Sequence, residues 1–226
     1  MIGFISYLVN GISLGSVYAI IALGYTMVYG IAKMLNFAHG DVIMIGAFVV
    51  FSTVSGAGLP PVIGVLISVV ACTLLGMAIE RIAYKPLRKA SKLAVLITAI
   101  GVSYFLQNVA LLIYGANTKS FTSVVTIEPL TLADGALVIS GETIVTVAAC
   151  IIIMIGLMTF MKYSKSGRAM LAVSEDSGAA QLMGVNVNSP IALTFAIGSA
   201  LAAIAGVLLC SSYPSLTPYP GSMPGI

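Results

Sequence analysis

Six apolar runs, most of them close to the length of a membrane span, constrain this chain more than any other feature of its sequence. They are residues 4–31, 42–54, 62–79, 93–114, 143–161 and 190–212. Only helices and closed barrels satisfy every backbone polar group inside hydrocarbon, and these runs lack the strict alternation of barrel strands. With only 8% charged residues, the sequence is also unlike a soluble domain. It therefore predicts an all-α polytopic membrane protein with about six transmembrane helices in one domain, residues 1–226.

The first apolar run, residues 4–31, is too long for a straight and upright span. At about 1.5 Å per residue, its roughly 28 residues exceed a hydrocarbon core of about 30 Å. The run therefore either tilts and reaches into the interface or breaks inside the membrane. Gly24 is the expected position of a break, because glycine weakens a helix. Interrupted helices in transporters tend to line the substrate path.

Small residues at every fourth position predict smooth faces on which helices pack closely. One such row lies in the first run, one in the third and one in the sixth. Their members are Gly11, Gly15 and Ala19; Gly64, Ser68, Cys72, Gly76 and Glu80; and Gly198, Ala202, Gly206 and Cys210. The cysteines are odd in number and fall inside apolar runs, so they indicate packing positions and neither a disulfide framework nor a metal site.

Basic residues predict the orientation of the chain. Most of the ten Lys and Arg residues lie at positions 81–92 and 162–168, close to span ends. Such clusters mark cytoplasmic ends, so both termini are expected outside, with residues 162–189 as a cytoplasmic loop and residues 115–142 as an external loop. Residues 124–127 and 137–139 of the external loop favour a small β-hairpin. Charges confined to span ends argue against a nucleic-acid partner.

A short polar break between the first two runs holds the single histidine of the chain, His39, together with Asn36 and Asp41. Three roles are open for this group: a structural loop in which Asp41 caps the next helix, a transport path or gate, and acid–base catalysis. On a helix, positions 36 and 39 share a face that Asp41 does not, so no preformed His–Asp pair is implied. Gln107 and Asn108, inside the fourth run, either hydrogen-bond neighbouring helices or contact a polar substrate.

The sequence lacks the motifs of the common ATP-hydrolysing and zinc-dependent sites. No segment fits the phosphate-binding pattern G-x-x-x-x-G-K-[ST], and no H-E-x-x-H or Cys/His ligand spacing occurs. We therefore expect a protein that is not an enzyme and that binds no metal or other cofactor itself.

The longest polar interruption, residues 162–189, has the composition of an ordered docking element. Residues 174–184 predict a short amphipathic helix, with Ser174 or Ser177 as its N-cap and Gly184 as its stop. Because spans hold this helix on both sides, a partner that moves the helix also moves the spans. The alternative is an interfacial helix that rests on lipid headgroups.

Two segments of the chain resemble a known family. The loop and the following span, beginning SKSGRAMLAVSEDSGAAQLMGVN at residues 164–186, look like the corresponding part of the permease subunits of high-affinity branched-chain amino acid ABC transporters. Residues 10–48, which include the polar break LNFAHGD, are similar to the N-terminal region of that family. The spans between the two segments fit the family in pattern and length.

The resemblance implies the permease subunit of an ATP-driven importer of branched-chain or related amino acids in the bacterial inner membrane. Its implied partners are a second permease subunit, two cytoplasmic ATPase subunits that use ATP and Mg, and a periplasmic amino-acid-binding protein. In such permeases an Ala-Ala-x-x-x-Gly loop docks into the ATPase. The candidate coupling residues of this loop are Gly167, Arg168, Glu175, Asp176, Ala179, Ala180 and Gly184.

The sequence departs from the family pattern at three points. Gly178 stands where the general importer motif has a glutamate, and no proline follows residues 191–193. Family members usually continue with further spans, so a C-terminally truncated and incomplete permease domain is expected. The alternative function is an ion-coupled secondary transporter of small polar solutes, which needs an ionisable group inside the spans. The His39 and Asp41 region is the candidate for such a group.

Overall fold

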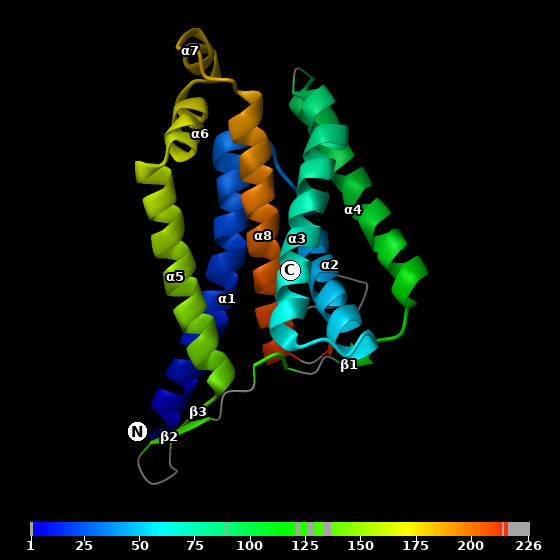
Figure 1. Cartoon of the computed structure of the whole chain (residues 1–226), viewed down its shortest axis with the longest axis vertical. Helices are drawn as coiled ribbons and strands as arrows, with labels where there is room; N and C mark the ends of the chain where they lie inside the picture. The colour runs from blue at the N-terminus through cyan, green and yellow to red at the C-terminus, as the bar shows by residue number, and fades with distance from the viewer. Residues whose placement is uncertain are drawn as a thin grey trace.

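The computed structural model of the chain describes residues 2–88, 90–120, 123–125, 129–132, 137–213 and 215–216, which are mainly helical (Figure 1). The α-helices are α1 (Ile2–Ala32), α2 (His39–Phe51), α3 (Pro61–Ile79), α4 (Lys92–Tyr114), α5 (Gly141–Tyr163), α6 (Lys165–Glu175), α7 (Ser177–Leu182) and α8 (Asn188–Ser212). Two π-helical turns, η1 (Ser52–Gly56) and η2 (Glu80–Tyr84), continue α2 and α3, and a 3-10 turn, η3 (Lys85–Leu87), follows η2. The strands are β1 (Lys119–Ser120), β2 (Leu130–Leu132), β3 (Leu137–Ile139) and β4 (Ser215–Leu216).

Six helical segments of the described chain are long and apolar enough to cross a membrane. They are Gly3–Ala32, His39–Gly56, Pro61–Leu87, Lys92–Tyr114, Gly141–Tyr163 and Asn188–Ser212. This arrangement confirms the predicted all-α polytopic fold. Helices α6 and α7 lie outside these six segments, at one end of the bundle that we call the α6–α7 end, which is uppermost in Figure 1.

Helix α8 is the centre of the bundle. It packs against α1, α2 and α3, and most of its side chains are buried within the chain itself. Helix α5 packs on the outer side of α1, whereas α4 reaches the bundle mainly through α2 and η2. The helices that surround α8 expose apolar side chains outward, as expected for helices that face lipid or other membrane subunits.

Small residues bring α8 close to its neighbours. A Cβ added at Gly206 would lie 2.4 Å from the carbonyl oxygen of Ile43 on α2, and one added at Gly76 would lie 1.9 Å from Ser199 Oγ on α8. Such contacts are shorter than any carbon can tolerate, so these two helix crossings require glycine. The predicted packing rows of the third and sixth spans are therefore confirmed. The row of the first span is different, because Gly11 and Gly15 face away from the described chain with no atom within 4 Å of an added Cβ.

The first span is one unbroken helix, so the predicted break at Gly24 is wrong and the alternative of a long continuous helix is correct. Gly24 instead lies where α1, α2 and α8 approach one another closely. An added Cβ would lie 2.9 Å from His39 Cε1 and 3.2 Å from the carbonyl oxygen of Gly198. The glycine is needed for packing at this point and does not interrupt the helix.

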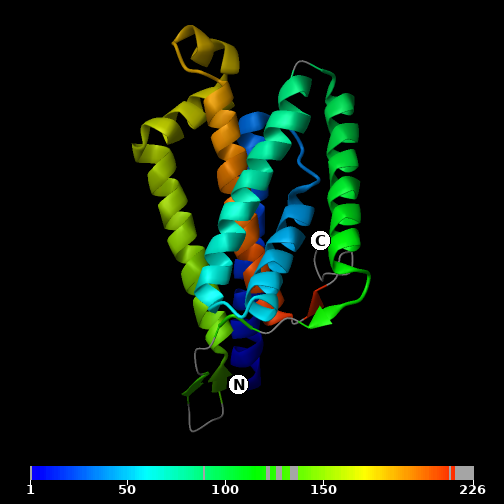
Figure 2. The same cartoon turned by 45° about the vertical axis from the view of Figure 1, so that its right-hand side comes forward.

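The interruption falls in the second span. Residues 33–38 form no helix, and α2 begins only at His39. Figure 2 shows this segment descending from the end of α1 to the start of α2, which lies well below the upper ends of α3 and α4. Together with η1, the helix from His39 to Gly56 has 18 residues. It is about 27 Å long, slightly less than a hydrocarbon core of about 30 Å.

The end of the bundle opposite α6 and α7 carries two short antiparallel strand pairs. Strands β2 and β3 pair Leu130 with Ile139 and Thr131 with Val138, so the predicted hairpin exists and its second strand is correct. Its first strand was misplaced, because Val124 and Val125 are not in a strand, while Thr126 and Ile127 lie outside the described residues. In the second pair, β1 is joined to β4 and thereby fixes the segment after α4 to the segment after α8.

Candidate functional site

The interrupted second span brings irregular backbone into the bundle. Backbone without helical hydrogen bonds is tolerated at membrane depth only where it is buried in protein or lines a water-filled cavity. Here Asn36, Ala38 and His39 are all buried. Asn36 and His39 of the predicted polar break therefore lie among the helices, whereas Lys33 and Phe37 of the same stretch are exposed.

Asn36 is hydrogen-bonded to η2. Its Oδ1 accepts a hydrogen bond from the hydroxyl of Tyr84, at 3.1 Å, and Tyr84 is itself fully buried. The Tyr84 ring packs against Phe195 of α8 with 5.1 Å between ring centroids. Asn36 thus joins the interrupted segment to the π-helical turn that follows α3 and, through the tyrosine ring, to the central helix.

His39 and Asp41 face different helices. His39, 4% exposed, lies against α1, where its ring is 6.1 Å from the Tyr25 ring and packs over Gly24. Asp41, 1% exposed, lies in the first turn of α2, where the positive end of the helix dipole favours a carboxylate. Gln107 of α4 donates a hydrogen bond to Asp41 Oδ1 at 3.0 Å.

Two polar atoms of this group have no hydrogen-bond partner among the described residues. They are Nε2 of His39 and Oδ2 of Asp41, and both are buried. A buried polar atom without a partner costs about 1–3 kcal/mol, so such atoms concentrate where a water, an ion or a substrate completes the site. The two unpaired atoms make the start of α2 a candidate position for a water, an ion or a substrate.

The two amides of α4 have separate positions. Gln107 points into the bundle and also donates to Ser103 Oγ at 3.1 Å, besides its bond to Asp41. Asn108 is exposed on the outer side of α4 and donates to the carbonyl oxygen of Tyr104 within the same helix, at 2.7 Å. Only Gln107 therefore joins the group formed by the polar break.

The polar loop at residues 162–189 is helical in two pieces. Helix α6 is capped by Ser164, whose Oγ accepts from the amide of Gly167 at 2.8 Å. Gly167 is buried in the first turn of α6, where an added Cβ would lie 2.3 Å from the carbonyl oxygen of Phe160 in α5. Glycine at this position allows α6 to fold back sharply against the end of α5.

Helix α7 is shorter than the single helix predicted for residues 174–184, and its N-cap was misassigned. Asp176 Oδ1 accepts from the amides of Gly178 and Ala179, at 2.8 and 3.0 Å, so the cap is neither Ser174 nor Ser177. An extended backbone at Asp176 separates α7 from α6, which ends at Glu175. Both serine and aspartate cap helices well, so sequence alone could not choose between adjacent candidates.

Gly184 ends α7 as predicted. Its φ of +85° is a left-handed conformation, and the amide of Val185 donates to the carbonyl oxygen of Ala180 across it, at 3.0 Å. The amide of Gly184 donates to Gln181 in the same way. This is the Schellman arrangement, in which glycine at the left-handed position closes a helix.

The outer surface of α7 is apolar at its tip. Leu182 is 91% exposed and Met183 is 85% exposed, whereas Ala180 is buried against the rest of the loop. Of the other candidate residues in this loop, Arg168, Glu175, Asp176 and Ala179 are all exposed. Leu182 and Met183 were not among the predicted site residues. The signal was present, because both are large apolar residues inside a polar segment that lies outside every span.

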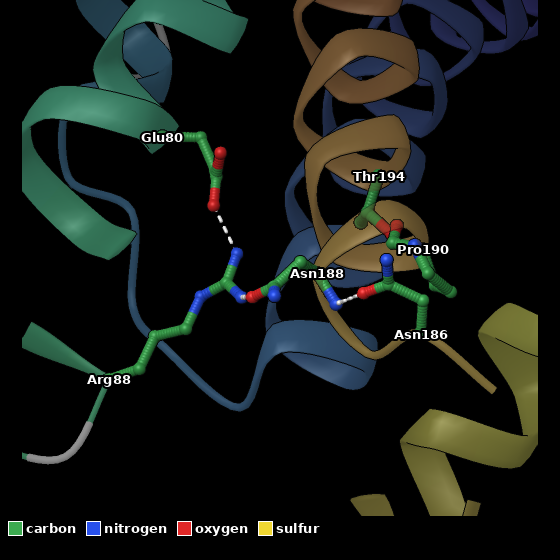
Figure 3. A network of polar contacts seen from close by, with 6 residues as sticks. All are labelled: Glu80, Arg88, Asn186, Asn188, Pro190 and Thr194. Atoms are coloured by element: carbon green, nitrogen blue, oxygen red, sulfur yellow. Dashed lines mark hydrogen bonds and ion pairs between the residues drawn. The ribbon is translucent and has the colours of Figure 1, made fainter. Parts of the chain in front are cut away.

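A polar network joins the loop to the turn after α3 (Figure 3). The Arg88 guanidinium pairs with Glu80 and also donates to the side chain of Asn188, the first residue of α8. Asn186, in the return from α7, accepts from the amide of Asn188 at 3.1 Å. The connection from η3 through Arg88 to the start of α8 therefore ties two segments at the α6–α7 end. Among the described residues, no three His, Cys, Asp or Glu side chains gather as metal ligands.

An unwound segment buried among transmembrane helices is the usual form of a substrate or ion site in transport proteins. The fold and the polar group at the start of α2 thus define a multi-pass membrane permease. The chain belongs to the family described as "Branched-chain amino acid transport system / permease component", whose model matches residues 7–224. The family places this chain among the permease components of transport systems and not among enzymes, and it confirms the resemblance found in the sequence.

Relatives from several organisms agree with this assignment. The high-affinity branched-chain amino acid transport system permease protein LivH of Salmonella typhimurium is 41% identical, over 99% of this chain and 76% of the relative. The permease protein BraD of Pseudomonas aeruginosa, described in the same words, is also 41% identical with the same coverage. A probable branched-chain amino acid transport permease protein of Methanocaldococcus jannaschii is 27% identical over 84% of this chain and 61% of the relative. No solved structure matches the chain.

Proposed function

We propose that this chain is the membrane-spanning permease subunit of an ATP-driven importer of branched-chain or related amino acids in the bacterial inner membrane. Its partners are a second permease subunit, cytoplasmic ATPase subunits that use ATP and Mg, and a periplasmic amino-acid-binding protein. The relatives at 41% identity are named as permease proteins of high-affinity branched-chain amino acid transport, which supports the substrate class.

The observation that carries the coupling proposal is the exposed apolar tip of α7. Leu182 and Met183 are almost fully exposed at an end of the bundle that lies beyond the spans. An apolar tip on a short helix outside the membrane suits a shallow groove in another protein. Behind the tip, α6 packs on α1, α5 and α8, so a force applied to α7 reaches three spans.

The orientation of the chain supports a cytoplasmic partner. Basic residues gather at the α6–α7 end, where α1, α3 and α5 finish and α4 begins. They include Lys33, Arg81, Lys85, Arg88, Lys92, Lys162, Lys165 and Arg168. Because Lys and Arg are retained on the cytoplasmic side, this end faces the cytoplasm in our proposal, and the β2–β3 hairpin faces the periplasm.

The interrupted second span is the proposed contribution of this subunit to the translocation path. A zwitterionic amino acid needs both hydrogen-bond donors and acceptors when it leaves water. The group at the start of α2 offers an imidazole, a carboxylate and an amide, from His39, Asp41 and Gln107. The unpaired Nε2 and Oδ2 atoms are the positions at which a passing solute or a water would bind.

Gly184 gives a direct test of the coupling proposal. Replacing Gly184 with Val places a β-branched residue at a φ of +85° and costs about 1–2 kcal/mol or more, so the end of α7 must rearrange. No neighbouring atom lies within 4 Å of an added Cβ, so the spans themselves are undisturbed. We expect the Gly184→Val variant to reach the membrane at the normal level and to lose ATP-dependent leucine uptake by about tenfold or more.

The matched control is Gly184→Asn. Asparagine tolerates the left-handed conformation far better than valine, so it should retain most of the uptake. Uptake in proteoliposomes that contain the assembled transporter, together with ATP hydrolysis by the same preparation, separates loss of coupling from loss of assembly. Normal uptake in the Gly184→Val variant would count against the proposal.

One observation favours the alternative of an ion-coupled transporter. Asp41 and His39 are ionisable side chains buried inside the bundle, which is where secondary transporters bind their coupling ions. The two mechanisms differ in their energy source. Uptake that an ionophore abolishes while ATP stays plentiful would favour ion coupling, and uptake that survives the ionophore favours the ATP-driven mechanism.

A further inference from the structure

A cavity at the α6–α7 end lies between the end of α1 and the beginning of α4. It has a volume of about 360 Å³, and the residues around it come from α1, the interrupted segment, η3 and α4. Helix α4 reaches the bundle mainly through α2 and η2 and not through α1. The cavity therefore lies between the end of one span, α1, and the beginning of another, α4.

Three cations border this cavity. They are Lys33 at the end of α1, Arg88 after η3 and Lys92 at the first position of α4, and no acidic side chain is among the described residues that line it. Arg88 is engaged with Glu80 and Asn188, but its Nε is buried without a partner in the described part of the chain. The described ion pairs include neither Lys33 nor Lys92. The cavity therefore has an excess of positive charge.

Lys33 occupies a backbone position that suits glycine better than lysine. Its φ of 55° is left-handed, and it is the only non-glycine residue of the described chain with positive φ. Glycine or asparagine normally takes this position after a helix, because other residues lose about 1 kcal/mol or more. A residue that is strained in this way is best explained by a task for its side chain.

Lys92 is also placed against local preference. A cation in the first turn of a helix opposes the positive end of the helix dipole, whereas an anion there is stabilised. Ser91 caps α4 by accepting from Ala94, and the amides before Ala94 are available to another acceptor. The positive charge of Lys92 and the positive end of the α4 dipole repel each other. A phosphate bound at this position would be attracted to both.

Part of the cavity wall is apolar. Tyr29, Val95 and Leu96 contribute to the lining, and Tyr29 is half-exposed on α1. A ligand that combines an anionic head with an apolar tail matches this arrangement of charge and apolar surface. In a membrane, that description fits a phospholipid of the cytoplasmic leaflet.

We propose that the cavity between α1 and α4 binds the headgroup of an anionic phospholipid, with its phosphate held by Lys33, Arg88 and Lys92. The acyl chains leave the site between Tyr29 and Leu96 and run along the diverging helices. This site does not depend on the transport mechanism, so its test and the Gly184 test fail independently.

The test compares the purified 226-residue chain in bilayer nanodiscs of phosphatidylcholine alone and of phosphatidylcholine with phosphatidylglycerol. Each basic residue near an anionic headgroup strengthens binding about fivefold, so the double variant Lys33→Gly/Lys92→Gln should bind phosphatidylglycerol about 25-fold more weakly. Retained lipid measured by native mass spectrometry reports this change, and the unfolding temperature should rise more with phosphatidylglycerol in the wild type than in the double variant.

Lys33→Gly alone separates charge from backbone strain. Glycine relieves the left-handed conformation, so in pure phosphatidylcholine the variant should be as stable as the wild type or more stable. Its response to phosphatidylglycerol should nevertheless fall. Lys85→Gln is the matched control. Lys85 is an exposed cation of η3, the turn just before Arg88, and it does not border this cavity.

Three results would overturn the proposal. One is equal retention of phosphatidylglycerol by the wild type and the double variant. A second is an equal rise in unfolding temperature when inorganic phosphate is added to nanodiscs of pure phosphatidylcholine, because the cavity would then be a site for a free anion. Loss of the lipid response in the Lys85→Gln control would likewise show that overall charge, and not the cavity, governs lipid binding.

Discussion

Among single residues, Asp41 has the most demanding environment in the bundle. Its side chain is buried, one carboxylate oxygen accepts from Gln107, and the other has no partner in the described chain. Removing a donor from a buried acceptor costs more than the hydrogen bond itself contributes, because the acceptor keeps its desolvation penalty. Loss of the Gln107 side chain should therefore destabilise the protein by more than the energy of one hydrogen bond.

The neighbouring amides of α4 allow this point to be tested with a closely matched pair. Gln107→Leu removes a donor to Asp41 and should lower stability by about 1–3 kcal/mol and reduce uptake. Asn108→Leu breaks only a bond within α4 on an exposed face and should change stability by less than about 1 kcal/mol. Thermal unfolding in detergent, with leucine uptake in parallel, measures both effects. Equal losses in the two variants would show that the bond to Asp41 is of no special importance.

Among elements, the crossing of α2 and α8 shows how glycine sets helix distance. At Gly206 the obstructing atom is the backbone oxygen of Ile43, which cannot rotate away as a side chain can. A methyl group at this position must therefore push the two helices apart. Overpacking of this kind typically costs about 1–3 kcal/mol.

The prediction at this scale compares Gly206→Ala with Gly156→Ala. Gly206→Ala should lower the free energy of unfolding by about 1–3 kcal/mol, because the clash is with backbone. Gly156 of α5 has no atom within 4 Å of an added Cβ, so alanine there should be neutral or slightly stabilising by helix propensity. The midpoints of thermal unfolding of the two purified variants decide the matter. A Gly206→Ala variant as stable as Gly156→Ala would mean that the crossing of α2 and α8 can accommodate a methyl group without loss of stability.

Much of the helical architecture could be predicted from the sequence, because apolar length and small-residue spacing are local signals. They gave the six spans and the packing faces of α3 and α8 correctly. They could not show that the row at Gly11 and Gly15 faces outward, because an identical pattern arises whether the neighbour belongs to the same chain or to another molecule. The neighbour of a helix is a property of the assembled bundle.

The site was less predictable for a physical reason. Asn36, His39 and Asp41 were recognised as candidates, but the sequence suggested a loop between spans, whereas the structure buries these three side chains among the helices. Whether irregular backbone enters a membrane depends on tertiary partners such as Tyr84, which lies far away in the sequence. The bond between Asp41 and Gln107 likewise joins positions 66 residues apart, a contact that no local pattern reports.

For the whole molecule, the arrangement suggests how a signal from outside the membrane reaches the polar group. Residues 183–187 lead from α7 into α8, and α8 contacts α2, which begins at His39, and η2, which ends at Tyr84. The Arg88 network fixes the first turn of α8 to the turn after α3. Movement of α7 would thus be transmitted to the centre of the bundle through one helix, if a partner binds its tip.

That condition leads to a prediction for the assembled transporter. Burying a Leu or Met side chain contributes about 1.5–3 kcal/mol, so replacing both Leu182 and Met183 with Ser should weaken binding of the ATPase subunit by about a hundredfold or more. The spans should be unaffected, because both side chains are exposed. Leu171→Ser is the control, since Leu171 is an exposed apolar residue of α6 away from the tip. Co-purification with the ATPase subunit measures the effect. Unchanged recovery with the double variant would mean that the tip of α7 is not the docking surface, and a loss as large with Leu171→Ser would spread that surface over α6.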